Sequence, residues 1–177
     1  MTTLITHALI PLTMGLVTPR QLLPWRLIFI GMLCAMLPDL DVAAFHFQIP
    51  YASPFGHRGW THSIMFALFM AGLVGILEKY RTQANPLRIA ILFVFIATLS
   101  HGVLDALTNG GLGIAFFWPF TQERYFFPVQ MIQVSPIGLK NFLSERGLRV
   151  LISEFQFIWL PCFFILIFSY FSRPKST

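Results

Sequence analysis

Charged side chains are scarce in this sequence. Asp, Glu, Lys and Arg make up 11% of the 177 residues, whereas soluble domains carry about 25%. Hydrophobic residues make up 56%, and the mean hydropathy is +0.71. Twenty phenylalanines, four tryptophans and four tyrosines would leave a soluble surface badly exposed. The composition excludes an ordinary soluble domain and predicts an integral membrane protein, with a length that suits one domain.

Cysteine is scarce as well. Cys34 and Cys162 are the two cysteines, and both lie in apolar runs. They exclude a disulfide framework and a CxxC metal motif. A clustered basic arm is also absent, so we expect no nucleic-acid partner. The net charge of +5 instead favours membrane lipid as the partner, through anionic headgroups.

The N-terminal segment lacks the marks of a cleaved signal peptide. Residues 4–17 are apolar, but no basic residue precedes them and no Ala-x-Ala site follows. We therefore expect this segment to be retained. It is shorter than the roughly 20 residues that span a bilayer, so it is expected either to span as a short tilted helix or to insert half-way.

Apolar runs and breaker residues predict an all-α fold, a polytopic membrane bundle of about four to five helices. The expected helices cover residues 4–17, 22–37, 61–79, 87–107 and 148–171. Residues 42–61 and the polar turn 82–86 are expected to be loops. Residues 110–147 hold prolines at 119, 128 and 136 and many aromatics, which is typical of an irregular segment at the headgroup level. One domain is expected over residues 1–177.

Topology predicts that the polar residues converge. If short turns join antiparallel neighbours, the starts of odd-numbered helices and the ends of even-numbered helices lie on one side of the membrane. That side receives all three aspartates and four of the five histidines, and such residues in a membrane segment indicate a functional site. The set is His7, Asp39, Asp41, His57, His62, His101 and Asp105. His46 lies on the same side, in a predicted loop.

The spacing of these residues favours a metal site. His101 and Asp105 are four residues apart and share one helical face. Imidazole with carboxylate suits zinc, manganese or iron. The expected ligands are His7, Asp39, His57, His62, His101 and Asp105. They exceed the three or four ligands of one catalytic zinc, so either two ions or one ion with an outer shell of carboxylates is expected.

A metal site at a membrane face predicts hydrolysis, because a bound metal activates water and polarises a phosphoryl oxygen. Arg58 is expected to hold a phosphate, and Asp41 or Asp39 to accept the proton of the water. Two alternatives remain open. The polar residues hold the bundle together, or they bind a structural metal without catalysis. Taken alone, His7 or His101 is also consistent with a hydrogen-bonded histidine inside the bundle, and Asp105 with an ion-pair partner of Arg58.

The same residues resemble a known family. The sequence is similar to the LexA-regulated, inner-membrane-bound proteins proposed as metal-dependent hydrolases, the YdjM-like group. The resemblance spans about 120 residues, and its motifs are specific together and weak apart. The matching pieces are Thr6-His7, Leu37-Pro38-Asp39-Leu40-Asp41, the segment HRGWTHS at 57–63, Ser100-His101-Gly102-Val103-Leu104-Asp105 with Thr108, Trp118-Pro119-Phe120 and Arg124-Tyr125. The resemblance implies a small helical protein of a bacterial inner membrane with a metal-dependent hydrolase site.

Basic residues predict the orientation of the bundle. Seven Lys or Arg lie opposite the site, in short turns and the C-terminal tail, and five lie on the site side, mostly in long segments. Basic residues in short segments favour the cytoplasm. We therefore expect a cytoplasmic C-terminus and a site on the periplasmic or outer face. The expected substrate is a phosphoester or a lipid-linked molecule.

Overall fold

The fold is a bundle of long antiparallel helices, seen in a computed structural model that describes residues 1–81 and 87–173. The expected turn 82–86 lies outside the described residues. The long helices are α1 (Leu4–Val17), α2 (Trp25–Met36), α4 (Ile64–Arg81), α5 (Leu87–Ala106), α7 (Glu145–Glu154) and α8 (Leu160–Ser172). Within the described residues the only β-structure is two isolated bridges. The all-α prediction is confirmed.

Three helical stretches are long and apolar enough to cross a membrane. They are Trp25–His46, Leu87–Ala106 and Glu145–Ser172, and the shorter helix Leu4–Val17 is also apolar. The third stretch is continuous because a π-helical turn, Phe155–Trp159, joins α7 to α8. These spans and the helical fold agree with the predicted polytopic bundle.

The second helix continues past the proline that was expected to end it. Pro38 lies in the first turn of a 3-10 helix, Leu37–Val42, which leads into the short helix α3, Ala43–His46. Proline is tolerated in a first turn, because the N–H that it lacks would have no helical partner there. Part of the expected loop 42–61 is therefore helical, and this extension carries Asp39 and Asp41.

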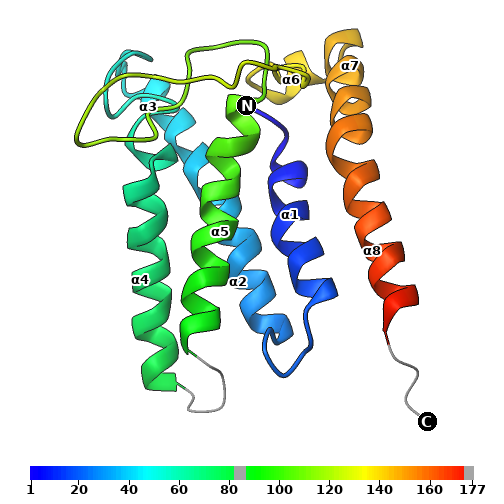
Figure 1. The fold of residues 1–177 in the computed structure, drawn as a ribbon. Coiled ribbons are helices and arrows are strands. Elements are labelled where there is room, and N and C mark those ends of the chain that lie inside the picture. Colours follow the sequence, from blue (N-terminus) through cyan, green and yellow to red (C-terminus); the bar gives the residue numbers. More distant parts are fainter. Residues whose placement is uncertain (82–86, 174–177) are drawn as a thin grey trace.

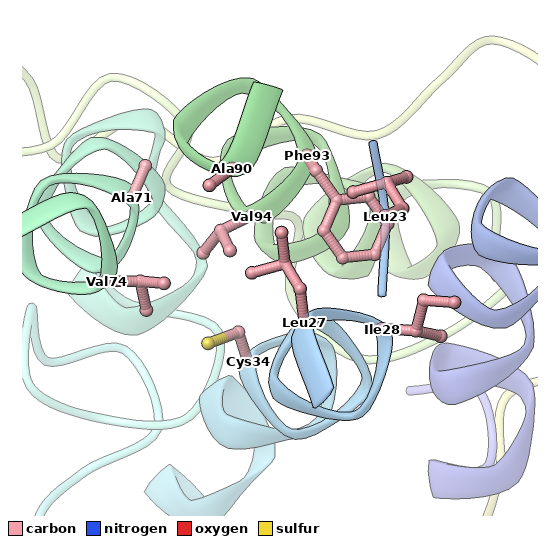
Figure 2. Packing of buried hydrophobic residues seen from close by; sticks show 9 residues of the cluster. All are labelled: Leu23, Leu27, Ile28, Cys34, Ala71, Val74, Ala90, Phe93 and Val94. Carbon is pink, nitrogen blue, oxygen red and sulfur yellow. The ribbon is translucent and has the colours of Figure 1, made fainter. Parts of the chain in front are cut away.

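Helix α5 lies at the centre of the bundle, where it packs against α4, α2 and α1, whereas α8 packs on α1 (Figure 1). A buried apolar cluster joins α2, α4 and α5 (Figure 2). Its members are Leu23, Leu27, Ile28, Cys34, Ala71, Val74, Ala90, Phe93 and Val94. This cluster holds α2 and α5 side by side, so their last turns, which lead to the polar residues described below, also lie near each other.

Small residues let α1 and α2 approach closely, as in many membrane bundles. A Cβ added at Gly15 of α1 would lie 2.5 Å from Cγ1 of Ile28 in α2, whereas a Cβ added at Gly72 of α4 would meet nothing within 4 Å. We expect Gly15→Ala to destabilise the protein by about 1–3 kcal/mol through overpacking. Gly72→Ala is the matched control and should cause no loss, since alanine is the better helix former. Thermal unfolding in detergent, followed by size-exclusion elution, measures both, and equal melting of the two variants would contradict this packing.

Candidate metal centre

The ends of four segments bring the predicted polar residues together at one end of the bundle, the end where α3 and α6 (Leu139–Phe142) lie in Figure 1. His7 comes from the first turn of α1, and Asp39 and Asp41 from the 3-10 helix after α2. His57 and His62 precede α4, and His101 and Asp105 end α5. His7, His101 and Asp105 have no exposed surface. His46, by contrast, is exposed.

Five side chains point their ligand atoms at a common space. His101 Nε2 lies 3.4 Å from Asp39 Oδ1 and 3.0 Å from His62 Nε2. His7 Nε2 lies 3.5 Å from Asp105 Oδ1, and His62 Nε2 lies 3.8 Å from Asp105 Oδ2. Two ligands each about 2.1 Å from a tetrahedral zinc are roughly 3.4 Å apart. The spacing therefore fits the inner ligands of a divalent cation.

Three carboxylate oxygens of this group accept no hydrogen bond from the described part of the chain, although Asp105 Oδ2 lies 3.2 Å from Arg58 Nε. Both oxygens of Asp39 and Oδ2 of Asp105 are buried and accept no hydrogen bond from the residues that the structure describes. A buried carboxylate without a partner is costly. A cation between these oxygens and the imidazoles would supply the missing interaction, so the residues fit a divalent metal.

The histidines offer lone pairs to the same space. His101 Nδ1 lies 2.7 Å from the carbonyl oxygen of Ala35 and therefore carries the proton that it donates, which leaves Nε2 unprotonated. His62 Nδ1 lies 3.2 Å from Asp41 Oδ2, which favours the tautomer with its proton on Nδ1. Burial lowers the pKa of His62 to about 4. His62 is therefore neutral at pH 7, as a ligand must be.

Asp41 lies behind two histidines. Its Oδ1 is 2.5 Å from His57 Nδ1, and its Oδ2 accepts hydrogen bonds from Thr61 Oγ1 at 2.7 Å and from the Arg58 backbone N–H at 3.0 Å. Carboxylates that orient ligating histidines make this kind of contact. His57 forms a second group of candidate ligands with Asp39 and His62, so Asp39 is shared by two groups. The arrangement accommodates one ion or two.

Asp41→Asn is expected to weaken zinc affinity by about 10–100-fold, the usual effect of losing an orienting partner. The asparagine amide presents a donor to one imidazole and so disturbs its tautomer. Competition with a chromophoric chelator measures the affinity. Glu123→Gln, at an exposed carboxylate, is the control and should leave the affinity unchanged. Equal affinities for both variants would show that Asp41 does not orient the centre.

Arg58 has a structural contact at each end of its guanidinium. Nη1 donates to the carbonyl oxygens of Gly110 at 2.8 Å and Leu112 at 3.0 Å, and Nη2 donates to Thr108 Oγ1 at 2.9 Å. Nε lies 3.2 Å from Asp105 Oδ2, and the side chain is fully buried. Arg58 therefore links Asp105 of the centre to the loop after α5. The predicted contact with phosphate stays a prediction.

Sequence reasoning missed Glu154. This fully buried carboxylate accepts hydrogen bonds from the Thr3 backbone N–H at 2.5 Å and from Thr3 Oγ1 and Thr6 Oγ1, each at 2.6 Å. It thereby joins the last membrane helix to the first turn of α1, which carries His7. The position of this glutamate directly before the uncharged run 155–172 was the available signal, because such residues rarely lack a partner.

Thr2 was also missed. Its backbone N–H donates to Asp105 Oδ1 at 2.8 Å, and its Oγ1 lies 2.7 Å from His7 Nε2. No sequence motif identifies it, since only the fold brings residue 2 to residue 105.

Arg124, one of the residues in the resemblance, binds the loop that leads to His57. It donates to the carbonyl oxygens of Tyr51, Ser53 and His57, each at 3.0 Å.

These features define a polytopic helical membrane protein with a buried histidine–aspartate centre at one end of its bundle. A family model described as YdjM inner membrane protein matches residues 1–175, and the chain belongs to this family. It is 42% identical to inner membrane protein YbcI of Escherichia coli over 161 residues, which are 91% of this chain and 92% of YbcI. It is 31% identical to inner membrane protein YdjM of E. coli over 77% of this chain and 67% of YdjM. No solved structure matches significantly. Family and apolar helices together support an inner-membrane location.

Proposed function

We propose that this protein is a membrane-bound, metal-dependent hydrolase that acts on a phosphoester or a lipid-linked substrate. The observation that carries the proposal is that both oxygens of Asp39 and Oδ2 of Asp105 accept no hydrogen bond from the described residues, while the Nε2 atoms of three histidines face these carboxylates. The ion is zinc, with manganese as the alternative, because imidazole and carboxylate together suit both. When bound, such an ion supplies a water of pKa about 7 and polarises a phosphoryl oxygen.

The residues of this chain have separable roles in the proposal. His7, Asp39, His101 and Asp105 form the first group of proposed ligands, and Asp39, His57 and His62 form a second group that holds a second ion if one binds. Asp39 and Asp41 are the proposed proton acceptors. Asp41 is favoured, because Asp39 belongs to both groups of candidate ligands and Asp41 belongs to neither.

A structural metal is the second candidate function. The complete burial of His7, His101 and Asp105 favours it, since structural sites are closed and catalytic sites keep a position open to water. Hydrolytic activity separates the two candidates, and metal content alone does not.

The test combines elemental analysis of detergent-purified protein with hydrolysis of phosphoesters, including phospholipids. Metal content and activity should both be present in the unsubstituted protein. His62→Ala should lose both, whereas Glu123→Gln should keep both. Folded protein that holds no metal after loading with zinc or manganese would overturn the proposal, and metal without hydrolysis would favour the structural site.

We further propose that the centre faces the periplasm and that the C-terminus is cytoplasmic. The support is the excess of basic residues at the helix ends opposite the centre. One of them, Lys175, lies outside the described residues. A C-terminal reporter that is active only in the cytoplasm should give signal, and activity of a periplasmic reporter instead would reverse this orientation.

A further inference from the structure

Two apolar hollows lie along the seam between α1 and the α7–α8 helix. The first has a volume of about 480 Å³, and its lining includes Thr2, Leu4, Ile5, Pro136, Phe142 and Leu151. The second has a volume of about 350 Å³, and its lining includes Leu9, Phe155, Trp159, Cys162, Phe163 and Leu166. Neither belongs to the metal centre itself.

The two hollows are aligned with each other. Ile5 and Leu9 are four residues apart on α1, and Leu151 and Phe155 are four residues apart on the opposite helix, so each pair shares a helical face. The two helices run side by side (Figure 1). Ile5 is 68% exposed and Phe155 is 50% exposed. Because these helices lie in a membrane, such exposed apolar faces contact lipid, and the seam is open to the bilayer.

The first hollow reaches the metal centre through one residue. Thr2 lines this hollow, and the same residue contacts Asp105 and His7. The polar groups of the lining, Thr2, Thr3 and Ser135, lie at this end, whereas the second hollow is lined by apolar side chains and Cys162. The few polar groups of this apolar seam therefore lie at the end beside the centre.

We propose that this seam binds one acyl chain of a membrane glycerophospholipid, with the phosphate end beside Thr2 and the metal centre. The lipid chain lies against Ile5 and Leu151 and continues toward Leu9 and Phe155. If the bound phospholipid is the substrate, the lipid site extends the proposed hydrolase function and rests on that proposal. As a binding site it stands on the hollows alone.

The experiment uses the full chain in nanodiscs that contain phosphatidylglycerol with a photoreactive diazirine in its acyl chain. Labelling should concentrate on peptides around Ile5 and Leu151. Ile5→Trp and, as an independent variant, Leu151→Trp should each reduce this labelling roughly fivefold or more, because an indole fills space that the chain requires. Leu73→Trp is the matched control, at a residue of α4 that is 42% exposed, and should have no effect.

His62→Ala separates the lipid site from the hydrolase. It should lose metal and keep the labelling, because it lies outside both hollows. If labelling is found without metal or hydrolysis in the unsubstituted protein, the lipid site stands and the proposed function fails. Labelling spread evenly over the lipid-facing helices, or unchanged in both tryptophan variants that elute as folded protein, would overturn the lipid site. Crosslinks between two copies of the chain at Ile5 and Leu151 would also overturn it, by assigning the seam to a second copy.

Discussion

Asp39→Asn is expected to reduce bound metal to less than about a tenth of the unsubstituted level, since losing an outer partner alone costs roughly 10–100-fold in affinity. Asp39 is the one residue shared by both groups of candidate ligands. Its oxygens approach His101 at 3.4 Å, His7 at 3.8 Å and His62 at 4.0 Å. The amide of asparagine lacks the negative charge that would balance a divalent ion among these imidazoles.

Elemental analysis after zinc loading measures this effect, and thermal stability adds a second, opposite signature. If the centre binds metal, Asp39→Asn should melt at a lower temperature than the unsubstituted protein, because ligand binding stabilises the folded state. If the centre binds none, the same substitution removes a costly buried charge and should stabilise the protein. Retained metal, or a higher melting temperature in zinc, would contradict the assignment of Asp39. Glu123→Gln again serves as the control with an unchanged result.

Arg58→Ala is expected to destabilise the protein by about 3–5 kcal/mol, the usual cost of removing one partner from a buried ion pair. The substitution frees Asp105, which lies 3.2 Å from Arg58 Nε. It also leaves Thr108 and two carbonyl oxygens of the loop after α5 without their donors. Arg58→Lys should recover only part of the stability, because one ammonium cannot reach what the planar guanidinium bridges.

Unfolding of the purified variants in denaturing detergent measures this loss. Arg149→Ala is the matched control. That arginine is exposed and its nearest carboxylate, Glu145, is 3.9 Å away, so the expected change is within about 0.5 kcal/mol. Similar stabilities for Arg58→Ala and Arg149→Ala would show that Arg58 does not stabilise the fold. That result would favour the phosphate-binding role predicted for Arg58.

Hydropathy and breaker residues predicted most of the fold, because the long apolar runs leave few alternatives in a membrane. The antiparallel order then placed residues as distant as His7 and Asp105 at one end of the bundle. The course of the chain after Pro38 was not predictable in this way, since a proline fits both the end of a helix and the first turn of a 3-10 helix. Helix α4 was expected from residue 61, but it begins at Ile64, after Ser63, whose Oγ accepts a hydrogen bond from the Phe66 N–H at 3.1 Å.

The detailed arrangement of the centre could not be predicted from the sequence. Helix ends predict which residues share a side of the membrane, but not which imidazole nitrogen faces inward. Asp41 is an example. It lies two residues from Asp39, so the sequence predicted the same position in the bundle for both carboxylates. The turn of the 3-10 helix directs Asp39 toward the histidine Nε2 atoms and Asp41 toward the Nδ1 atoms behind them.

The contact between Glu154 and the start of α1 has a consequence for biogenesis. Helix α1 leaves the ribosome first, yet the carboxylate that fixes Thr3 and Thr6 is separated from Thr6 by 148 positions. Membrane helices insert in order of synthesis, so α1 waits in the bilayer without this anchor until α7 has been made. Ribosome-bound chains that stop before Glu154 should therefore hold an immature centre, in which the start of α1 lacks this anchor. The last span would then act as the step that completes the site.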